Sequence, residues 1–212
     1  MRANARTRLL DAADLLLRRD GYDQTTMQQI VAEAGTSIGN AYFYFPNKER
    51  LLVELLEEAA RGIWDEVEAV VQDIAAGPSR IGTIIYWNVL SMLTVRRDLA
   101  QLVFLTERRV AGVEIVREIS IARWLPHLTA SFPERTAADV ALAAEAIFGA
   151  NRAVIMRNLA GRSDVEPARI AREMVRWSLR ALGASAAEID AAIRSGARRS
   201  RAQSSLKPLP RR

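Results

Sequence analysis

The side chains that could do covalent or metal chemistry are scarce in this chain of 212 residues. It holds a single histidine, His127, and no cysteine, so a histidine-based triad or a metal site would rest on one residue. No GxSxG nucleophile motif is present, and no pair of carboxylates stands out. Hydrogen-bonding groups gather instead in the segment TSIGNAYFY, residues 36–44. We therefore expect a binding protein that uses no metal and no cofactor, and not an enzyme.

Two short helices joined by a glycine turn are expected to position this segment. Thr26 can cap the first helix, and Gly35 supplies the left-handed residue that ends it. Ser37 caps a second helix to about Phe45, where Pro46 stops it. The apolar positions of the first helix follow the helical period: Met27, Ile30, Val31 and Ala34. So short a turn holds the two helices at a steep crossing angle, so the second helix can enter a major groove about 12 Å wide. The sequence therefore predicts a DNA-binding helix-turn-helix.

The exposed side of the second helix would supply the DNA contacts. Tyr42 and Tyr44 lie about 200° apart around the axis, so both cannot face the core, and we expect their hydroxyls to bond phosphate oxygens. Gly39 lets the backbone approach the duplex closely, and Phe45 is expected to fill the core. Asn40 is expected to read sequence, because an amide can pair with adenine through two hydrogen bonds. The alternative for Asn40 is a hydrogen bond to backbone at the helix start.

The stretch AGTSIGNAYFYFPNKERLL, with the residues before it, resembles the DNA-binding signature of the TetR family of bacterial transcriptional regulators over residues 5–52. The resemblance implies that four residues contact phosphates and that two face base edges. The phosphate set is Thr26, Ser37, Tyr42 and Lys48, and the base-edge set is Thr36 and Asn40. It also implies that the rest of the chain forms an all-helical domain that binds a ligand and dimerises.

Three positions depart from the usual family pattern. Thr36 stands where the family often has valine, and Tyr44 where histidine is commonest. Ala41 stands where a larger aliphatic residue is frequent, so we expect looser packing beneath the second helix.

Glycines and prolines divide the remainder of the chain into helices. A long helix is expected from Asn47 to about Ala76, before Gly77 and Pro78. Further helices are expected at 79–96, 98–110, 112–130, 135–160 and 167–182, with a short one after Ser185. No strand alternation and no internal repeat is evident. The predicted fold is all-α: a three-helix helix-turn-helix domain at 1–50, joined by the long helix to a helical ligand-binding and dimerisation domain at 51–195.

The net charge of +5 is concentrated at the C-terminal end, because residues 194–212 hold seven basic and no acidic side chains. Residues 196–212 are rich in Ser, Pro and Arg, so we expect a disordered, solvated tail. The alternative is a loose arm that binds phosphates without sequence preference.

No signal peptide opens the chain, and no run approaches the roughly 18 apolar residues that a membrane span needs. The absence of cysteine is compatible with a reducing compartment. We expect a cytoplasmic protein with no membrane partner.

Polar side chains interrupt the apolar stripes of three predicted helices. Asn88 lies on a stripe with Met92, His127 follows Trp124 by one turn, and Asn151 follows Phe148. A few polar groups among apolar walls are typical of small-molecule pockets, although each could instead make a satisfied core hydrogen bond. The predicted ligand-binding residues are Asn88, Met92, Trp124, His127, Phe148 and Asn151. The ligand is expected to be largely apolar, with one or two hydrogen-bonding groups.

One face of helix 135–160 consists of small residues, so another helix can approach it closely, as in a dimer. It is formed by Ala146, Gly149, Ala150 and Ala153. The family resemblance places the dimer in a four-helix bundle with helix 167–182, where Met174 and Trp177 supply a compatible stripe. The alternative for that stripe is an internal core contact. A two-fold homodimer would read a near-palindromic operator, with recognition helices about 34–36 Å apart or a multiple of that.

Together these features predict a ligand-responsive regulator that binds a double-stranded DNA operator, most naturally a repressor that a small molecule releases. The alternative is a DNA-binding regulator without a small-molecule effector, whose second domain only dimerises or docks a protein. In that case the three interrupted stripes would be fully packed, with no cavity.

Overall fold

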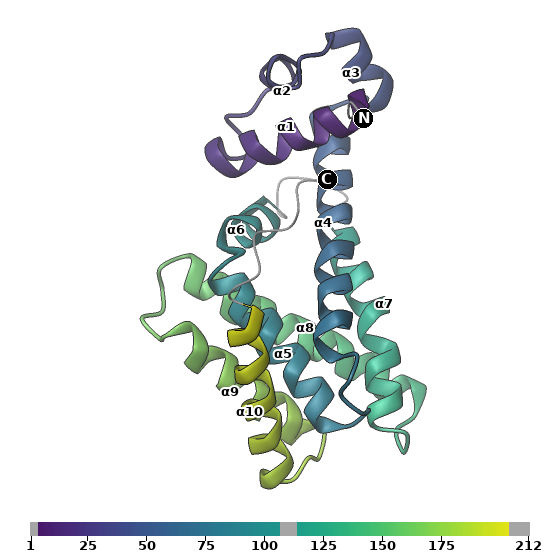
Figure 1. The fold of residues 1–212 in the computed structure, drawn as a ribbon, viewed down its shortest axis with the longest axis vertical. Coiled ribbons are helices and arrows are strands. Elements are labelled where there is room, and N and C mark those ends of the chain that lie inside the picture. Colours follow the sequence, from purple (N-terminus) through teal and green to yellow (C-terminus); the bar gives the residue numbers. More distant parts are fainter. Residues whose placement is uncertain (1–3, 107–113, 204–212) are drawn as a thin grey trace.

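The computed structural model describes residues 4–106 and 114–203. Within these ranges the chain forms ten α-helices and no strand, which confirms the predicted all-α fold. Figure 1 shows a small N-terminal unit standing at one end of a long helix, with the remaining helices packed around the other end of that helix.

The N-terminal unit consists of α1 (Ala5–Asp20), α2 (Met27–Glu33) and α3 (Ile38–Tyr44). The predicted caps are present: the Thr26 hydroxyl accepts from the Gln29 N–H, and the Ser37 hydroxyl accepts from the Asn40 N–H. Gly35 has φ +58°, the left-handed conformation expected of it. The core of the unit is closed by fully buried apolar side chains, Leu9, Ala13, Ile30, Ala41 and Phe45.

The long helix, α4 (Lys48–Val71), connects the two parts of the molecule. The Asn47 side chain accepts from the Arg50 N–H at 2.7 Å, as expected of its cap. The 24 residues of α4 span roughly 36 Å. The helix ends five residues before the predicted Ala76. Tertiary partners satisfy carbonyls there: Arg199 donates to Val70 O and Arg80 donates to Ile74 O.

Six helices complete the second part. They are α5 (Pro78–Leu93), α6 (Arg97–Thr106), α7 (Glu114–Ser131), α8 (Ala137–Leu159), α9 (Pro167–Ala181) and α10 (Ala186–Gln203). α5 lies in the middle of this group and contacts α4 and α6 to α10. Its buried residues include Ile81, Ile84, Ile85 and Val89.

The C-terminal helix differs from the prediction. Instead of a short helix followed by a disordered tail from residue 196, α10 runs for 18 residues to Gln203 and packs along α5. A Cβ at Gly196 would lie 2.6 Å from Tyr86 Cβ, so the two helices touch because this residue has no side chain. Thr83 Oγ1 donates to Ser195 Oγ at 3.0 Å in the same contact. The composition-based prediction was therefore wrong for residues 196–203, and the part of it on 204–212 lies outside the described residues.

Candidate DNA interface and ligand cavity

The α3 helix presents mixed aromatic and polar groups to solvent. Tyr42 and Tyr44 are 48% and 37% exposed, so neither is core filler, whereas Phe45 is fully buried as expected. Phe43 is 80% exposed, and its ring meets the Tyr44 ring edge to face with centroids 5.1 Å apart. The sequence places Phe43 on the exposed side of this helix with Tyr42 and Tyr44, but it predicts no DNA contact for Phe43. Three consecutive aromatic residues cannot all face one core.

Thr36 and Asn40 form one polar unit at the start of α3. Asn40 Nδ2 donates to Thr36 Oγ1 at 2.9 Å, and the Asn40 backbone N–H donates to the Ser37 hydroxyl. The amide is thus held by a side-chain hydroxyl and not by the backbone contact that was the alternative. Gly39 is exposed beside them, with nothing within 4 Å of the position of a Cβ. Base contacts by Thr36 and Asn40 remain a prediction.

Lys48 is engaged within the protein. Its Nζ donates to Tyr22 O at 2.6 Å and to Thr25 O at 2.7 Å, and it lies 4.0 Å from the centroid of the Tyr22 ring. Burial lowers the pKa of the Lys48 ammonium. The side chain therefore fastens the first turn of α4 to the loop between α1 and α2. Thr26, its predicted companion in phosphate binding, is exposed and keeps its cap with Gln29.

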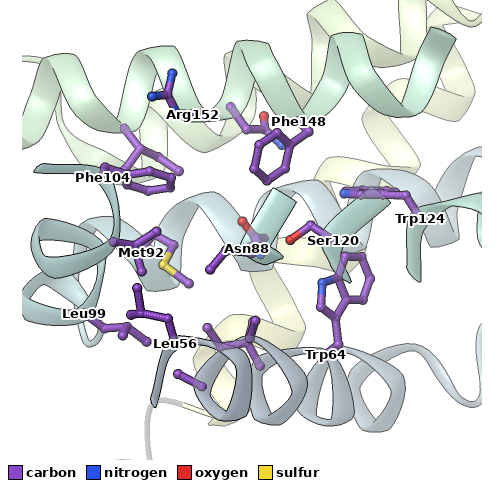
Figure 2. A pocket seen from close by; sticks show the side chains of 17 residues that line it. Leu56, Trp64, Asn88, Met92, Leu99, Phe104, Ser120, Trp124, Phe148 and Arg152 are labelled. Carbon is purple, nitrogen blue, oxygen red and sulfur yellow. The ribbon is translucent and has the colours of Figure 1, made fainter. Parts of the chain in front are cut away.

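The second domain contains a cavity bounded by α4, α5, α6, α7 and α8, which encloses about 690 Å³ including the space at its mouth. Figure 2 shows Trp64 reaching in from α4, Phe148 from α8 and Met92 from α5. Five of the six predicted ligand-binding residues line it: Asn88, Met92, Trp124, Phe148 and Asn151. Trp64 and Trp124 meet edge to face with ring centroids 5.5 Å apart, which makes one wall strongly aromatic.

His127 is the predicted residue that the structure does not place in the cavity. It is 5% exposed, its Nε2 lies 3.0 Å from Glu68 Oε1, and its ring stacks on Trp64 with centroids 6.3 Å apart. The imidazole thus joins α7 to α4 behind the tryptophan wall. Helical spacing correctly put His127 on the buried side of α7, but which neighbour it meets depends on Glu68, far away in sequence.

Asn88, Ser120, Asn151 and Arg152 bring polar groups to the cavity. Asn151 is 5% exposed, and no group among the described residues donates a hydrogen bond to its Oδ1. Arg152 is the single charged residue of the lining within the described part of the chain. Neither Ser120 nor Arg152 is among the residues predicted from the sequence. Arg152 follows Phe148 by one helical turn, which was the signal for it. Among the same residues no cluster of His, Asp or Glu is placed to hold a metal ion.

The predicted dimer face is only partly free in the single chain. Ala146, Gly149 and Ala153 are exposed on α8, and Trp177 is 51% exposed on α9. Ala150 is half-buried. Met174 is 7% exposed, so it is a core residue of the monomer, and its assignment to the interface was wrong. Met174 lies on the buried face of α9 with Ile170 and Ala171, about one turn before exposed Trp177. Leu142, 70% exposed, extends the α8 face by one turn.

A capped helix-turn-helix joined by one long helix to an all-helical domain with an apolar cavity defines a DNA-binding transcriptional regulator. Residues 9–55 match the model of the bacterial regulatory proteins of the tetR family. The helix-turn-helix part of the chain is thus that of a tetR-family regulatory protein. None of the helices that the structure describes is long and apolar enough to cross a bilayer.

Curated relatives share both sequence and regulatory class. The chain is 27% identical over 150 residues to the fatty acid metabolism regulator protein of Bacillus subtilis, which covers 66% of this chain and 76% of the relative. It is 30% identical over 90 residues to the nicotine-responsive transcriptional repressor HdnoR of Paenarthrobacter nicotinovorans, 41% of this chain and 46% of the relative.

Solved structures share the fold. The transcriptional regulator FadR from Bacillus subtilis, in complex with stearoyl-CoA, superposes with a TM-score of 0.67 and 20% identity over 81% of this chain and 96% of that chain. RolR in complex with resorcinol superposes with a TM-score of 0.70 and 22% identity over 97% of this chain and 95% of that chain.

Proposed function

We propose that the chain is a ligand-responsive repressor, which binds a near-palindromic operator as a homodimer and is released by a largely apolar small molecule. One observation carries the proposal: two of the helices that wall the cavity, α4 and α6, also support the DNA-binding unit. Leu56 and Trp64 of α4 and Leu99 and Phe104 of α6 line the cavity, and both helices contact α1. A ligand that separates α4 from α6 would move the two helices against which α1 packs.

Polar contacts hold the DNA-binding unit against α4. Arg6 pairs with Glu54 and Glu58, two carboxylates one turn apart on α4. Lys48 ties the start of α4 to the loop after α1. A displacement of α4 therefore carries α1, and with it the recognition helix α3. In a dimer this alters the distance between the two recognition helices, so a ligand that prefers one spacing shifts the population away from the operator-binding form.

The cavity walls favour an aromatic ligand. Four aromatic side chains, Trp64, Phe104, Trp124 and Phe148, line the cavity, and flat rings pack well against them. The resorcinol complex of RolR is a precedent in the same fold. A fatty-acyl ligand is the second candidate, because the curated relative matched over 150 residues is a fatty acid metabolism regulator.

The alternative without a small-molecule effector requires the interrupted stripes to be fully packed. Asn88 and Asn151 instead line an open cavity, which supports the ligand-responsive proposal. The deciding observation is the operator affinity in the presence of molecules that bind this cavity. If none of them changes that affinity, the second domain only dimerises or docks a protein, and the proposal fails.

Selection of bound fragments from a random DNA pool by the purified chain tests the DNA half of the proposal. We expect an enriched inverted repeat. Asn40→Ala should relax the preference at one position of each half-site, at a cost of about 1–3 kcal/mol, and Tyr42→Phe should weaken binding evenly across sequences. Salt-sensitive binding without an enriched sequence would mean that α3 is not the reader, and the regulatory mechanism would fall with it.

A further inference from the structure

Asn151 holds a buried acceptor that the protein leaves open. Its side chain is 5% exposed and lines the cavity, yet within the described residues no donor reaches Oδ1. Buried polar atoms in folded proteins are nearly always paired, because an unpaired one loses its bonds to water without replacement. Because Asn151 lines the cavity, a donor on a molecule held there would be the partner that this acceptor lacks.

A second buried asparagine on the same helix shows that the open acceptor is local to the cavity. Asn158 lies two turns after Asn151 on α8 and is 9% exposed. Its Oδ1 accepts from Arg97 Nη1 at 3.1 Å, and its Nδ2 donates to Val165 O at 3.5 Å. Asn158 Oδ1 therefore has the donor within the protein that Asn151 Oδ1 lacks.

The surroundings of Asn151 limit the kind of donor that could meet it. Phe148 precedes it by one turn and lines the cavity with Trp64 and Trp124, so the body of the ligand is flat and apolar. Among the described residues no carboxylate lines the cavity, so an ammonium group buried there would lack a counter-charge. The fitting donor is a neutral O–H or N–H carried on an aromatic ring.

We propose that Asn151 is a specificity-determining residue, which selects aromatic ligands that carry a hydroxyl or N–H donor over analogues that carry none. This inference rests on the proposed function, since it assumes that the cavity is the ligand site. It adds to that function the group on the ligand, a hydroxyl or N–H donor, that Asn151 recognises.

Titration calorimetry with two probes of nearly equal shape tests this selection. 2-Naphthol carries the donor, and 2-methoxynaphthalene replaces it with an ether that only accepts. We expect the wild-type protein to bind 2-naphthol about tenfold more tightly, the ratio that one net hydrogen bond gives. Asn151→Leu, of similar volume but without an acceptor, should bring the ratio close to one. Asn158→Leu changes another buried asparagine of α8, one that does not line the cavity, and should leave the tenfold ratio in place.

Thermal unfolding of the unliganded protein separates selection from a structural role. Loss of an unpaired acceptor should leave the Tm of Asn151→Leu equal to that of the wild type or a few degrees higher. A Tm lower by several degrees would show that Asn151 makes a structural bond and would overturn the inference. Asn151→Ala, which needs no extra room, repeats the binding test if the leucine variant does not fold.

The binding outcomes also separate this inference from the function beneath it. Equal affinity of the wild type for the two probes, or a tenfold ratio kept in Asn151→Leu, overturns the role of Asn151 and leaves the cavity as a ligand site. Absence of binding by both probes overturns the inference together with the proposed aromatic ligand class.

Discussion

At the scale of single residues, the same side-chain type can serve DNA or the fold, and contacts decide which. The family resemblance implies that Lys48 contacts a phosphate, whereas the structure gives its Nζ two backbone carbonyls and the face of Tyr22. An ammonium has three donors, so two of them are already used within the domain. We infer that Lys48 positions the DNA-binding unit on α4.

Lys48→Met tests this assignment. The variant loses two charge-assisted hydrogen bonds but keeps the length of the stem, so we expect the free energy of unfolding to fall by about 1–3 kcal/mol. Arg50→Met, on an exposed residue of the same helical turn, should change it by no more than about 0.5 kcal/mol. Both are measured by denaturant unfolding.

The salt dependence of operator binding tests the alternative, in which Lys48 contacts a phosphate. If Lys48 contacts a phosphate, Lys48→Met lowers the slope of log K against log salt by about 0.9. A lowered slope with unchanged stability would contradict the positioning role and restore the phosphate contact.

The sequence predicts the surroundings of some residues and not of others. Five of six cavity residues followed from helical spacing, because residues about one turn apart on a helix share a face. His127 shares the buried face too, but its partner Glu68 lies on α4 and diverts it from the cavity. Met174 was misplaced for the same reason, since spacing identifies an apolar stripe without saying which neighbour covers it.

At the scale of helices, starts were easier to predict than ends. Thr26, Ser37 and Asn47 each cap the helix that follows through a bond to a residue three positions on, so the signal is local. The end of α4 and the length of α10 depend on contacts between distant segments. Arg199 is the clearest case, because it joins α10 to the last turn of α4.

Arg199→Met should loosen this junction. Arg199 Nη1 donates to Val70 O at 2.8 Å, and we expect the loss of this bond to lower Tm by about 2–4 °C, as one net hydrogen bond does in a chain of this size. The adjacent Arg198 is exposed on the same helix, so Arg198→Met is the matched control and should leave Tm almost unchanged. Equal shifts for both variants would show that helix charge, and not the junction, is responsible.

The contribution of Asp73 gives the junction a pH dependence. The hydrogen bond from Arg199 lowers the pKa of the Asp73 carboxyl below its ordinary value. A carboxylate with a lowered folded-state pKa stabilises the protein above the unfolded pKa, and this stabilisation disappears as the pH falls through the folded-state pKa. The Tm difference between wild type and Arg199→Met should therefore be larger at pH 7 than at pH 3. It should not vanish, because the bond to Val70 O does not titrate.

At the scale of the whole molecule, exposed apolar residues lie on both α8 and α9, two helices that contact each other. Leu142, Ala146, Gly149 and Ala153 recur on α8 at spacings of four, three and four residues, and Trp177 stands on α9. This spacing makes a narrow stripe of the kind that packs against another helix. A second copy of the chain is the partner that a two-fold reader requires.

Trp177→Glu and Leu142→Glu should each convert the dimer into a monomer, because a carboxylate would be buried without a partner at the centre of the interface. Light scattering after size-exclusion chromatography measures the mass. Operator affinity should fall at least tenfold in the same variants, since a monomer engages one half-site at a time. Val95→Glu places the same charge at an exposed residue off this surface, 76% exposed between α5 and α6, and should leave both mass and affinity unchanged. A dimer that persists in both interface variants would move the interface elsewhere, and the coupling of ligand to operator would then need a route other than the spacing of two recognition helices.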